Sequence, residues 1–250
     1  MFHGAVRRVA KSIVGIMATW TDENNPPAMI RSRLVGSGFF LADNLAITAK
    51  HVTDAVIQDG GVYKFDGGEW MGVLACDGFK ETGLLVKPRF LWGRVLCASS
   101  SQDASVLLVP NSSARPVGIA EKPPKIGDSA GALGYPLAEN MPQSIRGRMR
   151  FTGGFISHVG ASQFPGEHAE FNAFELDTMF IPGISGGPVF RPDGKVFALT
   201  HGTMTLDGGL IGLSVAVGIT GLLPLLQDSL ALMKTLLDQK TPPKSREPSA

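Results

Sequence analysis

Short apolar segments separated by glycine and proline dominate this sequence of 250 residues. It contains 31 glycines and 17 prolines, whereas charged residues make up only 18% of the chain. Because these two residues interrupt helices and favour tight turns, the composition argues against a helical bundle or a coiled coil. A hydrophobic share of 44% is enough for one large core or two small ones. We therefore expect an all-β fold of many short strands.

The charge balance argues against nucleic acid as a partner. The chain carries 23 Lys and Arg against 22 Asp and Glu, so it has no basic field to gather phosphates. Its two cysteines, Cys76 and Cys97, cannot build a disulfide framework or a cysteine-rich zinc site. The sequence leaves open whether the two form a single disulfide bridge with each other. Nothing in the sequence indicates a cofactor or a metal.

Two apolar segments have features of membrane signals. Residues 12–18 follow three basic residues but are short for a signal peptide, and no cleavage motif follows, so we expect a first strand, with a targeting segment as the alternative. Residues 208–227 carry no charge, but glycines and a change from strand-like to helical spacing predict a buried strand followed by a helix. We expect no membrane span and a cytoplasmic location.

Turn-forming residues divide the chain into eleven strand candidates. These are Ile13–Thr19, Leu34–Leu41, Ala46–Ala49, Gly72–Ala75, Ser105–Val109, Ala130–Gly134, Arg148–Ser157, Ala173–Leu176, Val189–Phe190, Val196–Thr200 and Leu210–Val217. The stretch Pro110–Lys125 is poor in large apolar residues and separates two β units of about equal size. Helical spacing of leucines predicts a terminal helix over 221–239, and three prolines in 241–250 predict a disordered tail.

The sharpest chemical signal is a serine in the segment Gly183-Ile184-Ser185-Gly186-Gly187-Pro188. A serine hydroxyl acts as a nucleophile only when a tight turn exposes it and a base activates it. The glycines permit such a turn and allow the amides of Gly183 and Ser185 to form an oxyanion hole. The alternative is an ordinary glycine-rich hairpin loop.

Two further residues complete the chemistry that a serine nucleophile needs. His51 follows a predicted strand, which places its imidazole at a sheet rim as a candidate base. Asp103 directly precedes another strand and could orient the imidazole, with Asp54 and Asp77 as rivals. Taken alone, His51 could equally be a structural histidine and Asp103 a turn residue.

Together these segments resemble the trypsin-like serine peptidases, and most closely their bacterial HtrA/Deg-like branch. The resemblance rests on Thr48-Ala49-Lys50-His51, on the Ser185 segment, on residues 126–136 and 152–157, and on Asp177, and it covers about 14–219. It implies a chymotrypsin-like fold of two six-stranded antiparallel β-barrels with a C-terminal helix. A peptidase domain would then span 10–240, with barrels at about 10–115 and 125–220.

The same resemblance implies a catalytic triad of His51, Asp103 and Ser185 and an oxyanion hole formed by Gly183 and Ser185. Ile184 stands where trypsins activated by N-terminal cleavage carry an aspartate, so that mode of activation is not expected. No room for a PDZ domain is expected after the terminal helix.

The resemblance also suggests which residues bind substrate. Met179 lies six positions before the nucleophile, where trypsin carries the acidic base of its specificity pocket, so a small or medium apolar P1 residue is expected. Thr200, His201 and Gly202 match the strand that binds the substrate backbone, although His201 could instead be a packed rim histidine.

The sequence therefore favours a serine endopeptidase acting on protein or peptide substrates. The main alternative is a latent or inactive trypsin-fold module that binds peptides without turnover. An esterase is a third reading, but the serine does not lie on the strand-to-helix elbow of an α/β-hydrolase. The oligomeric state cannot be read from the sequence.

Overall fold

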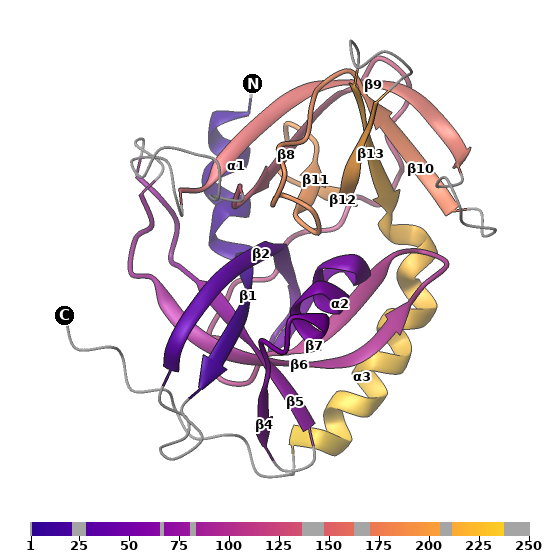
Figure 1. The fold of residues 1–250 in the computed structure, drawn as a ribbon. Helices are drawn as coiled ribbons and strands as arrows, with labels where there is room; N and C mark the ends of the chain where they lie inside the picture. The colour runs from indigo at the N-terminus through magenta and orange to yellow at the C-terminus, as the bar shows by residue number, and fades with distance from the viewer. Residues whose placement is uncertain are drawn as a thin grey trace.

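The computed structural model describes residues 2–21, 29–65, 68–80, 84–136, 148–162, 171–205 and 212–237, and the structural statements below refer to these residues. Two β-barrels make up most of the molecule, one above the other in the view of Figure 1. This arrangement confirms the predicted all-β, chymotrypsin-like fold.

The first barrel comes from the N-terminal half of the chain. Its strands are β1 (Ile13–Thr21), β2 (Met29–Ala42), β3 (Leu45–Ala49), β4 (Tyr63–Phe65), β5 (Gly68–Ala75), β6 (Arg89–Ser99) and β7 (Ala104–Leu108). Their order is β1-β2-β3-β7-β6-β5-β4, and antiparallel pairing of β1 with β5 closes six of them into a ring with β4 at the edge. Every residue of β3 and β7 is buried, because these neighbouring strands lie at the centre of the sheet.

The second barrel contains six strands. They are β8 (Ser129–Gly134), β9 (Arg150–Ser162), β10 (Phe171–Leu176), β11 (Pro188–Phe190), β12 (Val196–Thr205) and β13 (Gly212–Gly218). They form a closed antiparallel ring in the order β10-β13-β12-β11-β8-β9. All eleven predicted strands are therefore present in the two barrels, and β4 and β6 are additional strands that the sequence pattern did not show.

Helices pack on the outside of the barrels. They are α1 (His3–Val9), the 3-10 turn η1 (Ala10–Ser12), α2 (Lys50–Gln58), the 3-10 turn η2 (Ile219–Leu222) and α3 (Leu223–Leu237). The predicted terminal helix is confirmed as α3, which packs against β6 and β7 of the first barrel (Figure 1). The predicted tail at 241–250 lies outside the described residues. No helix in the described part of the chain is long and apolar enough to cross a membrane.

One hydrophobic cluster runs from the first barrel into the second, and a separate cluster that includes Ile156 and Phe174 lies within the second. A single cluster of buried side chains includes Val14 and Ile47 of the first barrel and Leu133 and Phe190 of the second. The connection between β7 and β8 is tied to both barrels, because Val117 donates a backbone hydrogen bond to the carbonyl of Phe40, and Ala120 donates one to Val196. The barrels are thus held in a fixed relation, with the candidate residues between them.

Candidate active site

His51 lies at the junction of β3 and α2, in the first turn of the helix. β3 ends at Ala49, whose ψ of 144° is extended, and α2 begins at Lys50. The sequence analysis placed His51 at the strand's end but did not predict the helix. The helix fixes the imidazole, because it leaves the backbone N–H of His51 without an intrahelical partner and directs it at a carboxylate.

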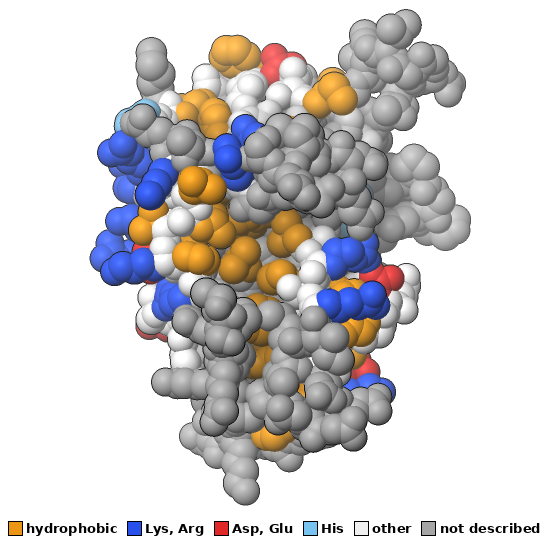
Figure 2. All heavy atoms as spheres, turned by 60° about the vertical axis from the view of Figure 1, so that its left-hand side comes forward, with side chains coloured by type: hydrophobic (Ala, Val, Ile, Leu, Met, Phe, Trp, Pro, Cys, Tyr) orange, Lys and Arg blue, Asp and Glu red, His pale blue; other side chains and the backbone are white. Residues whose placement is uncertain are grey.

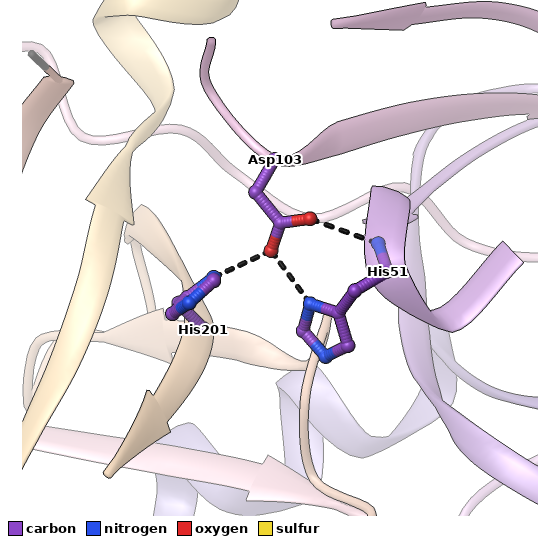
Figure 3. A group of neighbouring side chains, drawn as sticks. All are labelled: His51, Asp103 and His201. Carbon is purple, nitrogen blue, oxygen red and sulfur yellow. Dashed lines mark hydrogen bonds and ion pairs between the residues drawn. The ribbon is translucent and has the colours of Figure 1, made fainter. Parts of the chain in front are cut away.

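Asp103 supplies that carboxylate from the start of β7. Its Oδ1 accepts the backbone N–H of His51 at 2.8 Å, and its Oδ2 lies 2.7 Å from His51 Nδ1. The backbone of Asp103 is left-handed, with φ of +43°, and its carbonyl accepts the N–H of Lys50 at 3.0 Å. These contacts fix both the main chain and the side chain of Asp103 against α2 (Figure 3).

Asp103 remains ionised although it is only 6% exposed. Burial raises the pKa of this carboxyl, but hydrogen bonds from His201 and His51 and the charges of both rings outweigh burial and hold the pKa well below its usual range. A carboxylate accepts hydrogen bonds and donates none, which assigns a proton to the Nδ1 of His51 and leaves its Nε2 free to act as a base.

The rival carboxylates lie elsewhere. Asp54 forms an ion pair with Lys50, which lies one turn earlier in α2, and Lys50 Nζ is 2.5 Å from Asp54 Oδ2. Asp77 faces Arg89 at 3.5 Å. Neither makes a hydrogen bond or an ion pair with His51 in the described part of the chain, so Asp103 is the carboxylate that contacts the imidazole.

The Ser185 segment forms a tight loop between Phe180 and β11. Gly183 and Gly186 have φ of +97° and +83°, values that side chains disfavour. At Gly186 an added Cβ would lie 2.3 Å from both the Ser37 carbonyl oxygen and Thr48 Oγ1, so only glycine fits there. The glycines of the motif therefore allow the loop of the second barrel to press against β2 and β3 of the first.

Ser37 of β2 fastens this loop. Its hydroxyl accepts the backbone N–H of Tyr135 at 2.7 Å and donates to the carbonyl of Gly183 at 2.8 Å, while its own N–H donates to the carbonyl of Ser185 at 2.9 Å. The sequence analysis did not single out Ser37. Its place between two glycines was the available signal, and a Cβ added at one of them, Gly36, would lie 3.2 Å from the Ser185 carbonyl oxygen.

The Ser185 hydroxyl points to the edge of β12. It donates to the carbonyl of His201 at 3.0 Å, and no hydrogen bond joins it to His51 within the described residues. The amides of Gly183 and Ser185, the predicted oxyanion hole, donate to no protein acceptor in that same part of the chain. The loop thus holds the Ser185 hydroxyl against the strand that carries His201.

His201 contacts the same oxygen of Asp103 as His51. Its Nδ1 is 2.5 Å from Asp103 Oδ2, and its ring meets that of His51 edge to face at 5.2 Å between centroids (Figure 3). The sequence analysis placed His201 on the substrate-binding strand or in a packed rim. The structure gives it a third environment, a direct hydrogen bond to the carboxylate.

The other predicted substrate residues differ in their surroundings. Thr200 is buried, and its hydroxyl donates to the carbonyl of Ile184 at 2.5 Å, so its side chain supports the serine loop. Gly202 borders open space. The side chain of Met179 is 63% exposed, so it does not form the base of a closed specificity pocket in this structure. Asp177 accepts the N–H of Phe155 at 2.6 Å, which ties the loop before Met179 to β9.

A cavity in the described part of the chain lies away from this site. It measures about 1120 Å³ and lies beside α1, and its lining combines apolar residues such as Val6 and Phe151 with charged residues such as Arg8 and Lys195. Figure 2 views the molecule from the α1 side and shows apolar side chains gathered between groups of Lys and Arg. No residue of the His51 site lines this cavity.

Cys76 and Cys97, which could have formed a disulfide bridge, are both free.

Comparison with protein families finds one match that spans most of the two barrels. A model described as a trypsin-like peptidase domain matches residues 36–199. This range includes His51, Asp103 and Ser185.

A curated relative from Halomonas elongata is named a probable periplasmic serine endoprotease of DegP-like type. It is 26% identical over 189 residues, which cover 75% of this chain and 33% of the relative. The chain therefore spans about a third of the length of the relative it matches. The cytoplasmic location expected from the sequence is wrong on this comparison, because the relative is named periplasmic.

Solved structures share the fold at low sequence identity. A protease of M. tuberculosis in its active form has a TM-score of 0.62 and 19% identity, and the match covers 92% of this chain and 83% of that one. An HtrA-type protease solved with a decapeptide has a TM-score of 0.69 and 18% identity, covering 92% of this chain and 68% of that one. Both confirm the predicted double-barrel fold.

Proposed function

This chain belongs to the trypsin-like peptidase family, and from that membership we propose that it is a serine endopeptidase of HtrA type. The observation that carries the proposal is the Asp103 carboxylate, which holds His51 by both its backbone N–H and its Nδ1. That arrangement places the proton of a neutral imidazole on Nδ1, so Nε2 of His51 can take the role of the base.

In the proposed mechanism, the Ser185 hydroxyl turns from the carbonyl of His201 to Nε2 of His51. His51 takes the proton as Ser185 Oγ attacks the carbonyl carbon of the scissile peptide bond. Asp103 stabilises the imidazolium that forms, and the amides of Gly183 and Ser185 bind the developing oxyanion. His51 then protonates the leaving amine. Water hydrolyses the acyl-enzyme by the same steps in reverse, which restores the serine.

We further propose protein or peptide substrates with a small or medium apolar P1 residue. Support comes from Met179, an apolar residue at the position that determines charge preference in trypsin. The HtrA-type neighbour solved with a decapeptide supports a peptide ligand. The name of the curated relative supports a periplasmic location.

A second candidate function is a latent peptidase or a peptide-binding module. The observation that favours it is the Ser185 hydroxyl, which donates to a backbone carbonyl and not to His51. A latent enzyme would keep this arrangement until a partner or a substrate reorients the serine. The two functions differ in the reactivity of Ser185 in the isolated protein.

The deciding experiment is labelling with a fluorophosphonate probe, followed by mass spectrometry of the modified peptide. An active peptidase is expected to be labelled at Ser185, and Ser185→Ala is expected to abolish both labelling and peptide cleavage. Ser99→Ala serves as the matched control, because among the described residues that hydroxyl has a hydrogen bond only with the exposed Ser101. A folded protein that takes up no label would overturn the active-enzyme proposal in favour of the latent module.

A panel of peptides that differ only at P1 tests the specificity proposal. Peptides with Ala, Val or Leu at P1 are expected to be cleaved with higher kcat/KM than those with Lys or Arg. A preference for Lys or Arg would show that Met179 does not determine P1 choice.

A further inference from the structure

Ser37 of β2 holds the loop that carries Ser185 through both its side chain and its main chain. Its hydroxyl donates to the carbonyl of Gly183 at 2.8 Å, and its N–H donates to the carbonyl of Ser185 at 2.9 Å. The same hydroxyl accepts the N–H of Tyr135 at 2.7 Å. Because Ser37 has no exposed surface, water cannot replace these bonds if the hydroxyl is lost. The hold on the loop therefore depends on the Ser37 side chain.

The carbonyls that Ser37 holds belong to the same two residues whose amides would bind the oxyanion. Along the chain, the peptide groups held by Ser37 therefore alternate with the groups that carry the N–H of Gly183 and of Ser185. The group that carries the Ser185 N–H lies between two held groups. Because peptide groups are planar, holding both neighbours restricts the rotations that could redirect this N–H. The Cα of Ser185, from which the hydroxyl projects, lies in the same restrained segment.

Ser37 is also tied to the strand that leads to His51. The hydroxyl of Thr48, in β3, donates to the Ser37 carbonyl at 2.6 Å, and His51 follows Thr48 by three residues. Thr48 is buried, and it pairs with Gly38 in the antiparallel ladder of β2 and β3. Two successive hydrogen bonds, from Thr48 to Ser37 and from Ser37 to Ser185, thus connect the segment that bears the imidazole to the segment that bears the nucleophile.

Glycines let the chains approach Ser37 closely from the second barrel. A Cβ added to Gly134 would lie 2.6 Å from Ser37 Oγ, and one added to Gly186 would lie 2.3 Å from the Ser37 carbonyl oxygen. These contacts limit movement of the loop toward β2, and the hydrogen bonds limit its movement away. The position of the loop relative to the first barrel is therefore restrained in both directions.

We propose that Ser37 is a positioning residue that holds the Ser185 hydroxyl and the oxyanion amides in register with His51. The proposal rests on the peptidase function proposed above. In this role Ser37 acts through the loop and does not touch the substrate. A displacement of about 1 Å between reacting groups can lower a rate about a hundredfold. Loss of the Ser37 hydroxyl is therefore expected to impair the chemical step and to spare substrate binding.

The test compares Ser37→Ala with the parent, both as the full chain. We expect kcat for peptide cleavage and the rate of fluorophosphonate labelling to fall about 10- to 100-fold. Binding of a fluorescent peptide with Val at P1, measured by anisotropy with Ser185→Ala in both proteins, is expected to stay unchanged. A purely structural role of Ser37 would lower the unfolding free energy but leave kcat of the folded protein at the parent value.

Two further variants complete the design. Ser12→Ala is the matched control, because Ser12 is also buried and its hydroxyl donates to a backbone carbonyl, that of Arg115, beside the cavity at α1. It is expected to leave kcat unchanged. Thr48→Val serves where Ser37→Ala does not fold, because it keeps every bond between Ser37 and the loop and removes only the bond from β3 to Ser37. It is expected to lower kcat by a smaller factor, again with unchanged peptide binding.

A folded Ser37→Ala protein with the kcat of the parent would overturn the proposal, as would an unchanged kcat in Thr48→Val if Ser37→Ala does not fold. Equal losses of kcat and of peptide binding would also overturn it, because they would indicate general damage to the site. A parent protein that takes up no fluorophosphonate would instead reject the proposed peptidase function itself, so the two failures are distinguishable.

Discussion

Asp103 is the residue on which the site's geometry depends. It binds the backbone and the ring of His51 and also the ring of His201. Asp103→Asn keeps the shape but replaces an acceptor by a group that donates, which favours the wrong tautomer of His51. We expect kcat to fall about a thousandfold or more. Asp54→Asn, one turn from His51, is the control and is expected to retain activity; if it lost as much activity as Asp103→Asn, the assignment would be wrong.

The lowered pKa of Asp103 also predicts how stability depends on pH. A carboxyl whose pKa is lower in the folded state stabilises the fold fully above the unfolded value of about 3.9, and the contribution is lost as pH falls toward the folded value. The unfolding free energy of the parent should therefore exceed that of Asp103→Asn at neutral pH, and this difference should shrink below about pH 4. Urea unfolding at several pH values measures it, and a difference that grows on acidification would contradict it.

At Gly186, both a positive φ and close packing against the first barrel require glycine. Gly186→Ala places a Cβ at positive φ and within 2.3 Å of two oxygen atoms of the first barrel. We expect a loss of about 3 kcal/mol or more in unfolding free energy, together with loss of labelling at Ser185. Gly118→Ala is the control, because its added Cβ would meet only Lys195 at 4.0 Å. Equal stability of the two variants, measured by urea unfolding, would count against this packing.

At the scale of elements, α3 depends on burial at its start. Leu222 ends η2 with no exposed surface, whereas the adjacent Leu223 is 54% exposed. We expect Leu222→Ala to lower the unfolding free energy by about 2–5 kcal/mol and Leu223→Ala to change it little. Chemical unfolding of the two variants makes the comparison, and similar losses would show that α3 does not pack as described.

The sequence pattern predicted elements whose signal is local. Alternating apolar residues between turn formers identified strands such as β3 and β7, and leucine spacing identified α3. It missed α2 because Lys50–Gln58 is short and follows a strand without a capping side chain. It missed β6 because Gly93 and Arg94 divide its apolar residues into two short runs, Phe90–Trp92 and Val95–Ala98.

The candidate site divides in the same way. The sequence segments around His51, Asp103 and Ser185 resemble known motifs, so these three residues could be chosen as candidates from the sequence alone. The contact between His201 and Asp103 joins residues 98 positions apart in different barrels, and no local pattern encodes such a pairing. Ser37 was missed for the same reason, since its partners Tyr135 and Gly183 belong to the other barrel. Where a side chain acts across the interface of the barrels, the sequence alone does not show its role.

At the scale of the whole molecule, the shared core predicts that the two barrels unfold together. All three tryptophans, Trp20, Trp70 and Trp92, lie in the first barrel, so their fluorescence reports on that barrel alone. Far-UV circular dichroism reports on both barrels. Because buried residues of both belong to one cluster, we expect coincident urea transitions by the two probes.

A substitution in the second barrel tests whether the two barrels unfold in one step. Leu199 of β12 has no exposed surface and belongs to the shared cluster. Leu199→Ala should lower the unfolding free energy by about 2–5 kcal/mol and shift the tryptophan transition by the same amount as the dichroism transition. If the barrels were independent, the fluorescence midpoint would stay at its parent value while the dichroism curve split in two. Equal shifts would show that the interface holding Asp103, His201 and Ser185 together forms in the same step as the barrels themselves.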